Sequence, residues 1–198
     1  MKKIILSLGL VASVSFAAQA QSIKYGLKAG ASLTNITGSK QDNKFGFNGG
    51  VLANFGINDM FSIQPEVLYS NKGYKFANGQ NNLRFALNYI DVPVLVKVAT
   101  GSTGLFFELG PQAGFRLTAD VKDADDAISF KEYTRSVDFG YAAGLGFQVE
   151  SGPMIGLRYN GGFTNVGQDS NVNGIRATAA NAKNSAFQLY VGYMFGGK

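Results

Sequence analysis

The stretch FGYAAGLGFQVE, residues 139–150, alternates between two kinds of residue. Its odd positions are mostly bulky and apolar: Phe139, Tyr141, Ala143, Leu145, Phe147 and Val149. Its even positions are small and then polar: Gly140, Ala142, Gly144, Gly146, Gln148 and Glu150. A period of two is typical of a β-strand whose faces meet different surroundings. The face that points inward decides whether this chain folds in water or in lipid.

The same alternation recurs along the chain, and helical periodicity is hard to find. The pattern predicts eight strands, near residues 23–33, 45–55, 61–72, 87–99, 105–121, 139–150, 155–163 and 187–195. The connections alternate too: short ones at 58–59, 100–103 and 151–153, and long ones at 37–43, 71–82, 122–136 and 167–184. Long loops at one end, with tight turns and both termini at the other, are typical of an up-and-down outer-membrane barrel.

The first twenty residues have the features of a secretory signal peptide. A basic start, MKK, precedes an apolar stretch and a small-x-small site, Ala18-Gln19-Ala20. We therefore expect residues 1–20 to be removed and residues 21–198 to form a single barrel domain. Removal leaves 16 basic and 13 acidic residues, a net charge of +3 that is too small to indicate a nucleic-acid partner.

Composition narrows the fold further. The chain has 26 glycines, 16 phenylalanines and no cysteine, so an exported form has no disulfide framework. After residue 21 no apolar run is long enough to span a bilayer as a helix. If the chain crosses a membrane, only a closed, antiparallel, all-β barrel can satisfy its backbone.

The glycines indicate which face is inside. A soluble barrel would have to fit several bulky side chains per strand into a lumen that holds few, and would expose glycine to water. The reverse orientation places Gly, Ser, Asn and a few charges in the lumen, and Phe, Tyr, Val and Leu against hydrocarbon. Outward aromatic residues then gather toward both strand ends, as two interfacial belts.

Three prolines interrupt this pattern. Pro65, Pro93 and Pro111 lie within three successive predicted strands, and each lacks a ladder donor. We expect local bulges that help to curve the sheet. A weakened seam for gating or partner docking is the alternative.

The charged residues in the lumen phase form the candidate site. They carry both signs on neighbouring strands: Lys28, Glu66, Asp91, Lys97, Glu108, Arg116, Asp138 and Arg158. An unpaired charge in a narrow lumen is costly, so we expect these groups to pair and to plug the lumen. A proton or ion pathway and a catalytic carboxylate pair are the alternatives.

Other chemistry lacks its usual groups. The chain contains no histidine and no cysteine, which excludes Ser-His and Cys-His nucleophiles and the usual nitrogen and sulfur ligands of zinc. Asp123, Asp125 and Asp126 form an acidic patch without EF-hand spacing. We expect no enzyme activity, no metal and no cofactor.

Taken together, these segments resemble the PorT-like outer-membrane β-barrel family of Gram-negative bacteria. The resemblance is carried by YGLKAGASLTN (25–35), FGFNGGVLANFGI (45–57), FSIQPEVLYSNKG (61–73), YIDVPVLVKV (89–98), FFELGPQAGF (106–115), IGLRYNGGFTNV (155–166) and AFQLYVGYMF (186–195). It implies an eight-stranded barrel in the outer membrane with no known enzymatic role, in contact with lipid and with the barrel-insertion machinery. One departure is that Phe195 does not end the chain, because Gly196-Gly197-Lys198 follows it.

The leading expectation is a non-enzymatic barrel in the cell outer membrane with a structural or surface-interaction role, in which a protein partner binds the long extracellular loops. One alternative is a narrow, porin-like channel for ions or small solutes. Another is a soluble, secreted, lipid-binding barrel.

Overall fold

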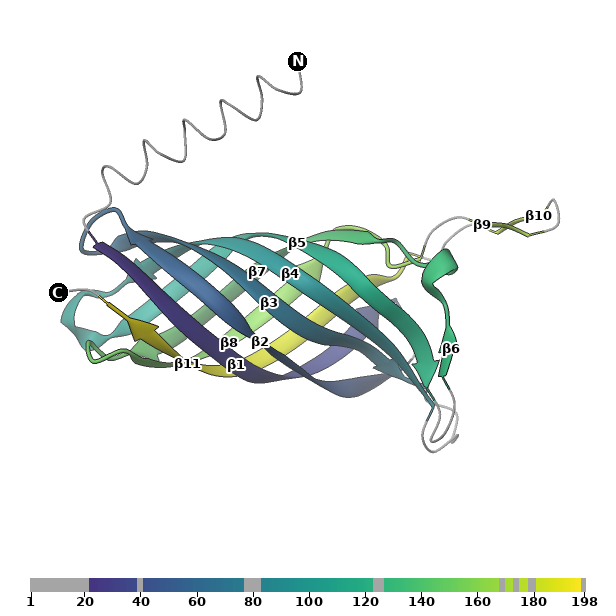
Figure 1. Cartoon of the computed structure of the whole chain (residues 1–198), viewed down its shortest axis with the longest axis horizontal. Coiled ribbons are helices and arrows are strands. Elements are labelled where there is room, and N and C mark those ends of the chain that lie inside the picture. The colour runs from purple at the N-terminus through teal and green to yellow at the C-terminus, as the bar shows by residue number, and fades with distance from the viewer. Residues whose placement is uncertain are drawn as a thin grey trace, which may run out of the picture.

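Eight long strands form a closed barrel (Figure 1). A computed structural model describes residues 22–38, 41–76, 83–122, 127–167, 170–172, 175–177 and 181–196. The barrel strands are β1 (Ser22–Thr37), β2 (Asp42–Gly56), β3 (Phe61–Lys75), β4 (Arg84–Ala99), β5 (Leu105–Lys122), β7 (Val137–Gln148), β8 (Pro153–Gly162) and β11 (Lys183–Phe195). The short elements are η1 (Gly101–Thr103), β6 (Ala127–Ser129), η2 (Lys131–Tyr133), β9 (Ser170–Val172) and β10 (Ile175–Ala177).

Every barrel strand pairs antiparallel with its neighbours in the chain, and β1 pairs with β11 to close the ring. This topology confirms the predicted up-and-down, eight-stranded barrel. We call the end that carries β6, β9 and β10 the loop end, and the opposite end, where β1 begins and β11 finishes, the turn end (Figure 1). None of the described helical segments has the length and apolar character needed to cross a membrane.

The strands reach further toward the loop end than the sequence predicts. β1 continues to Thr37 and β2 begins at Asp42, so the long loop expected at 37–43 is wrong. β3 likewise continues to Lys75, and β4 begins at Arg84. The expected signal peptide and the patch at Asp123, Asp125 and Asp126 lie outside the described residues.

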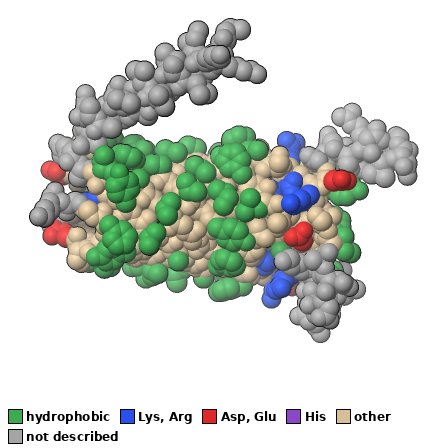
Figure 2. Space-filling model, viewed as in Figure 1, with side chains coloured by type: hydrophobic (Ala, Val, Ile, Leu, Met, Phe, Trp, Pro, Cys, Tyr) green, Lys and Arg blue, Asp and Glu red, His purple; other side chains and the backbone are tan. Residues whose placement is uncertain are grey.

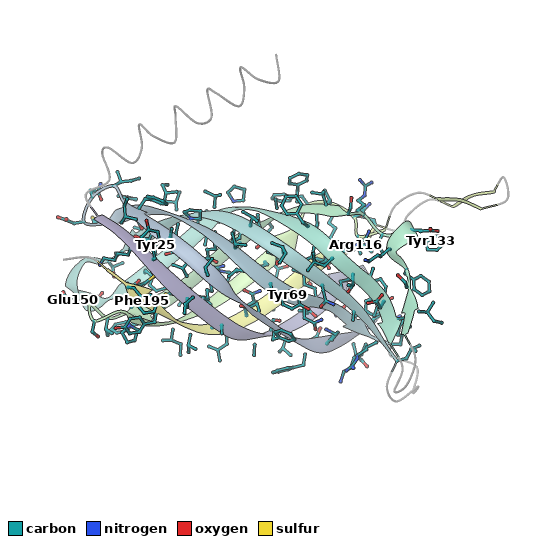
Figure 3. The ribbon with its side chains drawn as sticks, in the orientation of Figure 1. Tyr25, Tyr69, Arg116, Tyr133, Glu150 and Phe195 are labelled. Carbon is teal, nitrogen blue, oxygen red and sulfur yellow. The ribbon has the colours of Figure 1, made fainter. Side chains whose placement is uncertain are left out.

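The two faces of the barrel are sorted as predicted. Bulky apolar side chains cover the outside of the barrel, as Figure 2 shows along its middle, and the buried side chains inside include most of the lumen-phase charges. Phe45 is 69% exposed, whereas the lumen residues Lys28 and Arg158 are 3% and 2% exposed. In Figure 3, Tyr25 and Phe195 lie near the turn end and Tyr69 lies toward the loop end. Aromatic side chains therefore occur near both ends of the apolar band.

The prolines do not cause the bulges that the sequence predicts. The pairing register is the same on both sides of Pro65, Pro93 and Pro111. A proline removes one hydrogen-bond donor without adding a residue, so the ladder skips a bond but keeps its register. The register shifts lie elsewhere, between Asn43 and Asn48 and between Asn88 and Tyr89.

Candidate functional site

Four charged side chains meet in the middle of the lumen. We call Lys28, Glu66, Glu108 and Arg158 the central quartet. Arg158 donates from Nη1 to Glu66 Oε2 at 2.7 Å, from Nη2 to Glu66 Oε1 at 2.9 Å and from Nε to Glu108 Oε1 at 2.6 Å. Lys28 Nζ lies 3.4 Å from Glu66 Oε2. All four side chains are fully shielded from solvent.

The quartet is electrically balanced, with two cations and two carboxylates. Balance matters here because a buried charge is tolerated only when it is paired and hydrogen-bonded. The planar guanidinium of Arg158 can bind one carboxylate with two parallel bonds and still reach a second. Gln64 donates a further bond of 2.8 Å to Glu66. The geometry therefore holds the charges in one fixed arrangement.

Tyr190 on β11 contacts two members of the quartet, Glu108 and Lys28. Its hydroxyl donates to Glu108 Oε1 at 3.0 Å, and Lys28 Nζ lies 3.6 Å from the centre of its ring. The ring fits because glycines face it. A Cβ on Gly156 would lie 2.5 Å from the ring, and one on Gly30 would lie 2.8 Å from Tyr190 Cβ. The small residues of the alternation thus leave room for the large lumen side chains.

A second polar layer lies on the loop side of the quartet. Lys72 Nζ donates to Asp91 Oδ1 at 2.8 Å. Asp138 accepts hydrogen bonds from Asn184 and Thr164. The acidic groups in this layer are therefore held by separate partners and do not join the quartet.

Apolar side chains pack together in the lumen toward the loop end. The buried members of this loop-side cluster are Ile36, Phe85, Leu87, Tyr89, Ala119 and Val166. Phe130, which precedes η2, packs against them. Apolar side chains from the strand extensions and from the loops fill this part of the lumen.

A smaller apolar cluster lies on the turn side of the quartet. Its members are Leu52, Phe106, Met154, Tyr190 and Met194. Beyond it, a cavity of about 730 Å³, which we call the vestibule, opens at the turn end. Lys97 lies there, with its Nζ 2.6 Å from Gln148 Oε1 and 3.9 Å from the centre of the Phe106 ring.

The structure brings together only part of the predicted site. Four of the eight residues form the quartet, while Asp91, Asp138 and Lys97 are buried elsewhere in the lumen. The prediction that Arg116 pairs with a charge in the lumen is wrong. Its guanidinium is at the loop end and donates to the carbonyls of Lys131, Thr134 and Arg135, so it holds the segment around η2 and belongs to no ion pair in the described part of the chain (Figure 3).

Among the residues of the lumen network that sequence reasoning missed are Lys72 and Tyr190. Lys72 shares the inward phase of Glu66 on β3, so the alternation that found Glu66 also signals Lys72. Tyr190 shares the inward phase of Gln188 on β11, but a tyrosine carries no formal charge that marks it for pairing. Within the described ranges, no group of three or more potential metal-ligating side chains occurs.

A closed antiparallel barrel with an apolar exterior and a polar interior is the architecture of an integral outer-membrane protein. The family model for the outer membrane protein beta-barrel domain matches residues 18–168, and the chain belongs to this family. The protein is located in the outer membrane, which excludes the soluble carrier. The narrower PorT-like relationship stays a prediction. No curated protein matches the chain.

Solved structures share the fold. Neisserial surface protein A, NspA, is 18% identical with a TM-score of 0.53, and the match covers 87% of this chain and 97% of that chain. Ail, the attachment invasion locus protein of Yersinia pestis, is 18% identical with a TM-score of 0.51, covering 88% and 98%. At this level of identity the similarity supports the barrel fold alone.

Proposed function

We propose that the protein is a non-enzymatic, non-conducting barrel that anchors an interaction surface in the outer membrane. The observation that supports this proposal is the order in which layers of side chains are stacked inside the lumen. The loop-side cluster, the central quartet and the turn-side cluster follow one another along the barrel axis. An ion crossing the barrel would have to displace bonded charges and packed apolar side chains in turn.

The loop end supplies the surface. By the usual orientation of outer-membrane barrels it faces outside the cell, and the turn end faces the periplasm. Two long connections are tied together here: Thr134 and Gly167 form a β-bridge, and the backbone N–H of Arg135 donates to the carbonyl of Val166. Arg116 braces the first of these connections from β5. A braced surface suits binding, because less chain entropy is lost when a partner docks.

Single-channel recording tests the closed lumen. The protein, reconstituted in a planar bilayer, is expected to give no steady conductance at any moderate voltage. A variant with enlarged gaps in the lumen serves as the control for an absence of conductance. Replacing Phe106, Tyr190 and Leu87 by serine removes bulk from both apolar clusters and is expected to raise conductance. Steady conductance of the natural protein would instead favour the narrow channel.

A further inference from the structure

The vestibule at the turn end contains a buried cation, Lys97, that forms no ion pair with the residues that the structure describes. Lys97 is 6% exposed, and it lines the cavity together with Lys24. Within the described part of the chain, no carboxylate oxygen lies within 4.0 Å of its Nζ, the distance that defines an ion pair. Its contacts are the amide oxygen of Gln148 and the ring of Phe106.

The cross-strand neighbour of Lys97 is a carboxylate of the quartet, Glu108. Its Oε1 accepts bonds from Arg158 and Tyr190, and its Oε2 has no hydrogen-bond partner and forms no ion pair with Lys97. A buried ammonium with one neutral acceptor keeps unused donors, and in the described part of the chain no carboxylate is in direct contact with it. Lys97 differs in this respect from Lys28 and Lys72, which each have a carboxylate.

The vestibule wall adds polar groups from neighbouring strands. Lys24 on β1 is paired with Asn54 on β2, and Ser62 on β3 is paired with Lys97 on β4. All four residues line the same cavity. The acidic residues of its lining, Asp59 and Glu150, are exposed and come from the connecting turns, and Figure 3 shows Glu150 at the turn end. The positive groups therefore lie on the walls and the negative groups at the rim.

We propose that the vestibule binds a small anion that carries a carboxylate or phosphate group, with Lys97 and Lys24 as its cationic contacts. The cavity is large enough for a ligand of metabolite size, and charge-assisted hydrogen bonds from two ammonium groups give such a group its affinity. In the orientation proposed above, this site opens to the periplasm. It is independent of whether the lumen conducts.

Titration calorimetry on the protein in zwitterionic micelles tests the site. The probes are citrate for carboxylates, pyrophosphate for phosphates and sucrose as a neutral control. We expect saturable binding of at least one anion and none of sucrose. Lys97→Met should weaken binding about tenfold, the loss expected for one charge-assisted contact. Lys183→Met, at the loop end, should leave it unchanged.

Gln148→Glu separates binding from folding. It places a carboxylate beside Lys97 from within the protein, so Lys97 gains an ion-pair partner while the ligand loses its cation. This variant should fold as the natural protein does and bind neither anion. Citrate binding alone would identify a carboxylate ligand, and pyrophosphate binding alone a phosphate ligand. Absence of saturable binding, or equal binding by Gln148→Glu, would overturn the proposal.

Discussion

Arg158 and Glu66 join opposite walls of the barrel. Arg158 lies on β8 and Glu66 on β3, and three strands separate them around the ring in either direction. Their two parallel hydrogen bonds, of 2.7 and 2.9 Å, therefore span the lumen and do not link neighbouring strands. The pair braces the barrel across its diameter.

Removing one half of this brace should cost more than removing both halves. Arg158→Met leaves two carboxylates against one lysine, and breaking a buried pair in this way costs about 3–5 kcal/mol. The double variant Arg158→Met, Glu66→Gln leaves Lys28 with Glu108 and should be more stable than the single variant. Urea unfolding in phospholipid vesicles measures both. Additive effects in this double-mutant cycle would refute the coupling, and Arg135→Met at the loop end is the matched control.

The cost of a charge on the lipid-facing surface should depend on depth. Val94 is 45% exposed and pairs with Pro65 away from both aromatic ends, so Val94→Arg should cost about 2–4 kcal/mol. Leu145 is level with Phe107, toward the turn end, and Leu145→Arg should cost less. Ser151→Arg, in an exposed turn, should change little. Equal losses at the three sites in the same unfolding assay would contradict the placement of the membrane.

The contact between Gly156 and Tyr190 predicts a glycine that cannot be replaced. Gly156→Ala places a methyl group 2.5 Å from the ring and should destabilise the barrel by about 1–3 kcal/mol through overpacking. Gly49→Ala, whose new methyl would be no closer than 3.4 Å to any neighbour, is the control. The temperature at which the folded band disappears in unheated-versus-heated gel electrophoresis reports both. In a Tyr190→Leu background, Gly156→Ala should cost less than it does in the natural protein, and an equal cost in both backgrounds would assign the loss to the backbone.

Arg116 should matter to the loops and little to the barrel. Arg116→Met removes three bonds to the carbonyls of Lys131, Thr134 and Arg135, so the connection between β6 and β7 should be cleaved faster in limited proteolysis. Because the guanidinium is at the barrel rim, barrel stability should change by less than about 1 kcal/mol. Lys75→Met, an exposed change at the same end, should leave the cleavage rate unaltered. A large loss of barrel stability would contradict this placement and indicate that the Arg116 side chain belongs to the lumen charge network.

The alternation of side chains predicts the membrane-spanning part of the fold because lipid and lumen select opposite residue types. Phe45 and Phe47 meet hydrocarbon, whereas Gly46 and Asn48 face inward, and the sequence alone distinguishes these two environments. The same signal fails beyond the membrane. Leu87 and Phe85 point inward although they are apolar, because at the loop end the interior is a packed core.

The site was harder to predict than the fold. Period two identifies which charges point inward, and the up-and-down order indicates which strands lie opposite each other, but neither gives the level of each side chain along the barrel axis. The partner of Arg158 therefore depends on a stagger that one sequence does not display. Arg116 shows a second limit. The register shifts by one residue between Asn88 and Tyr89, and beyond this shift Ala119, not Thr118, occupies the buried phase. A local irregularity of this kind leaves no periodic signal.

The join between β1 and β11 has a consequence for biogenesis. Tyr25 at the start of the barrel has Phe195, near the end of the chain, as its partner, and the two strands remain in register as far as Thr37 and Lys183. In a chain that lacks β11, one edge of β1 has no strand to pair with. One edge of β8 is unpaired for the same reason. Strand edges with unpaired N–H and C=O groups can pair with other chains and cause aggregation. The first and seventh strands of the ring are therefore fully paired only once β11 is in place.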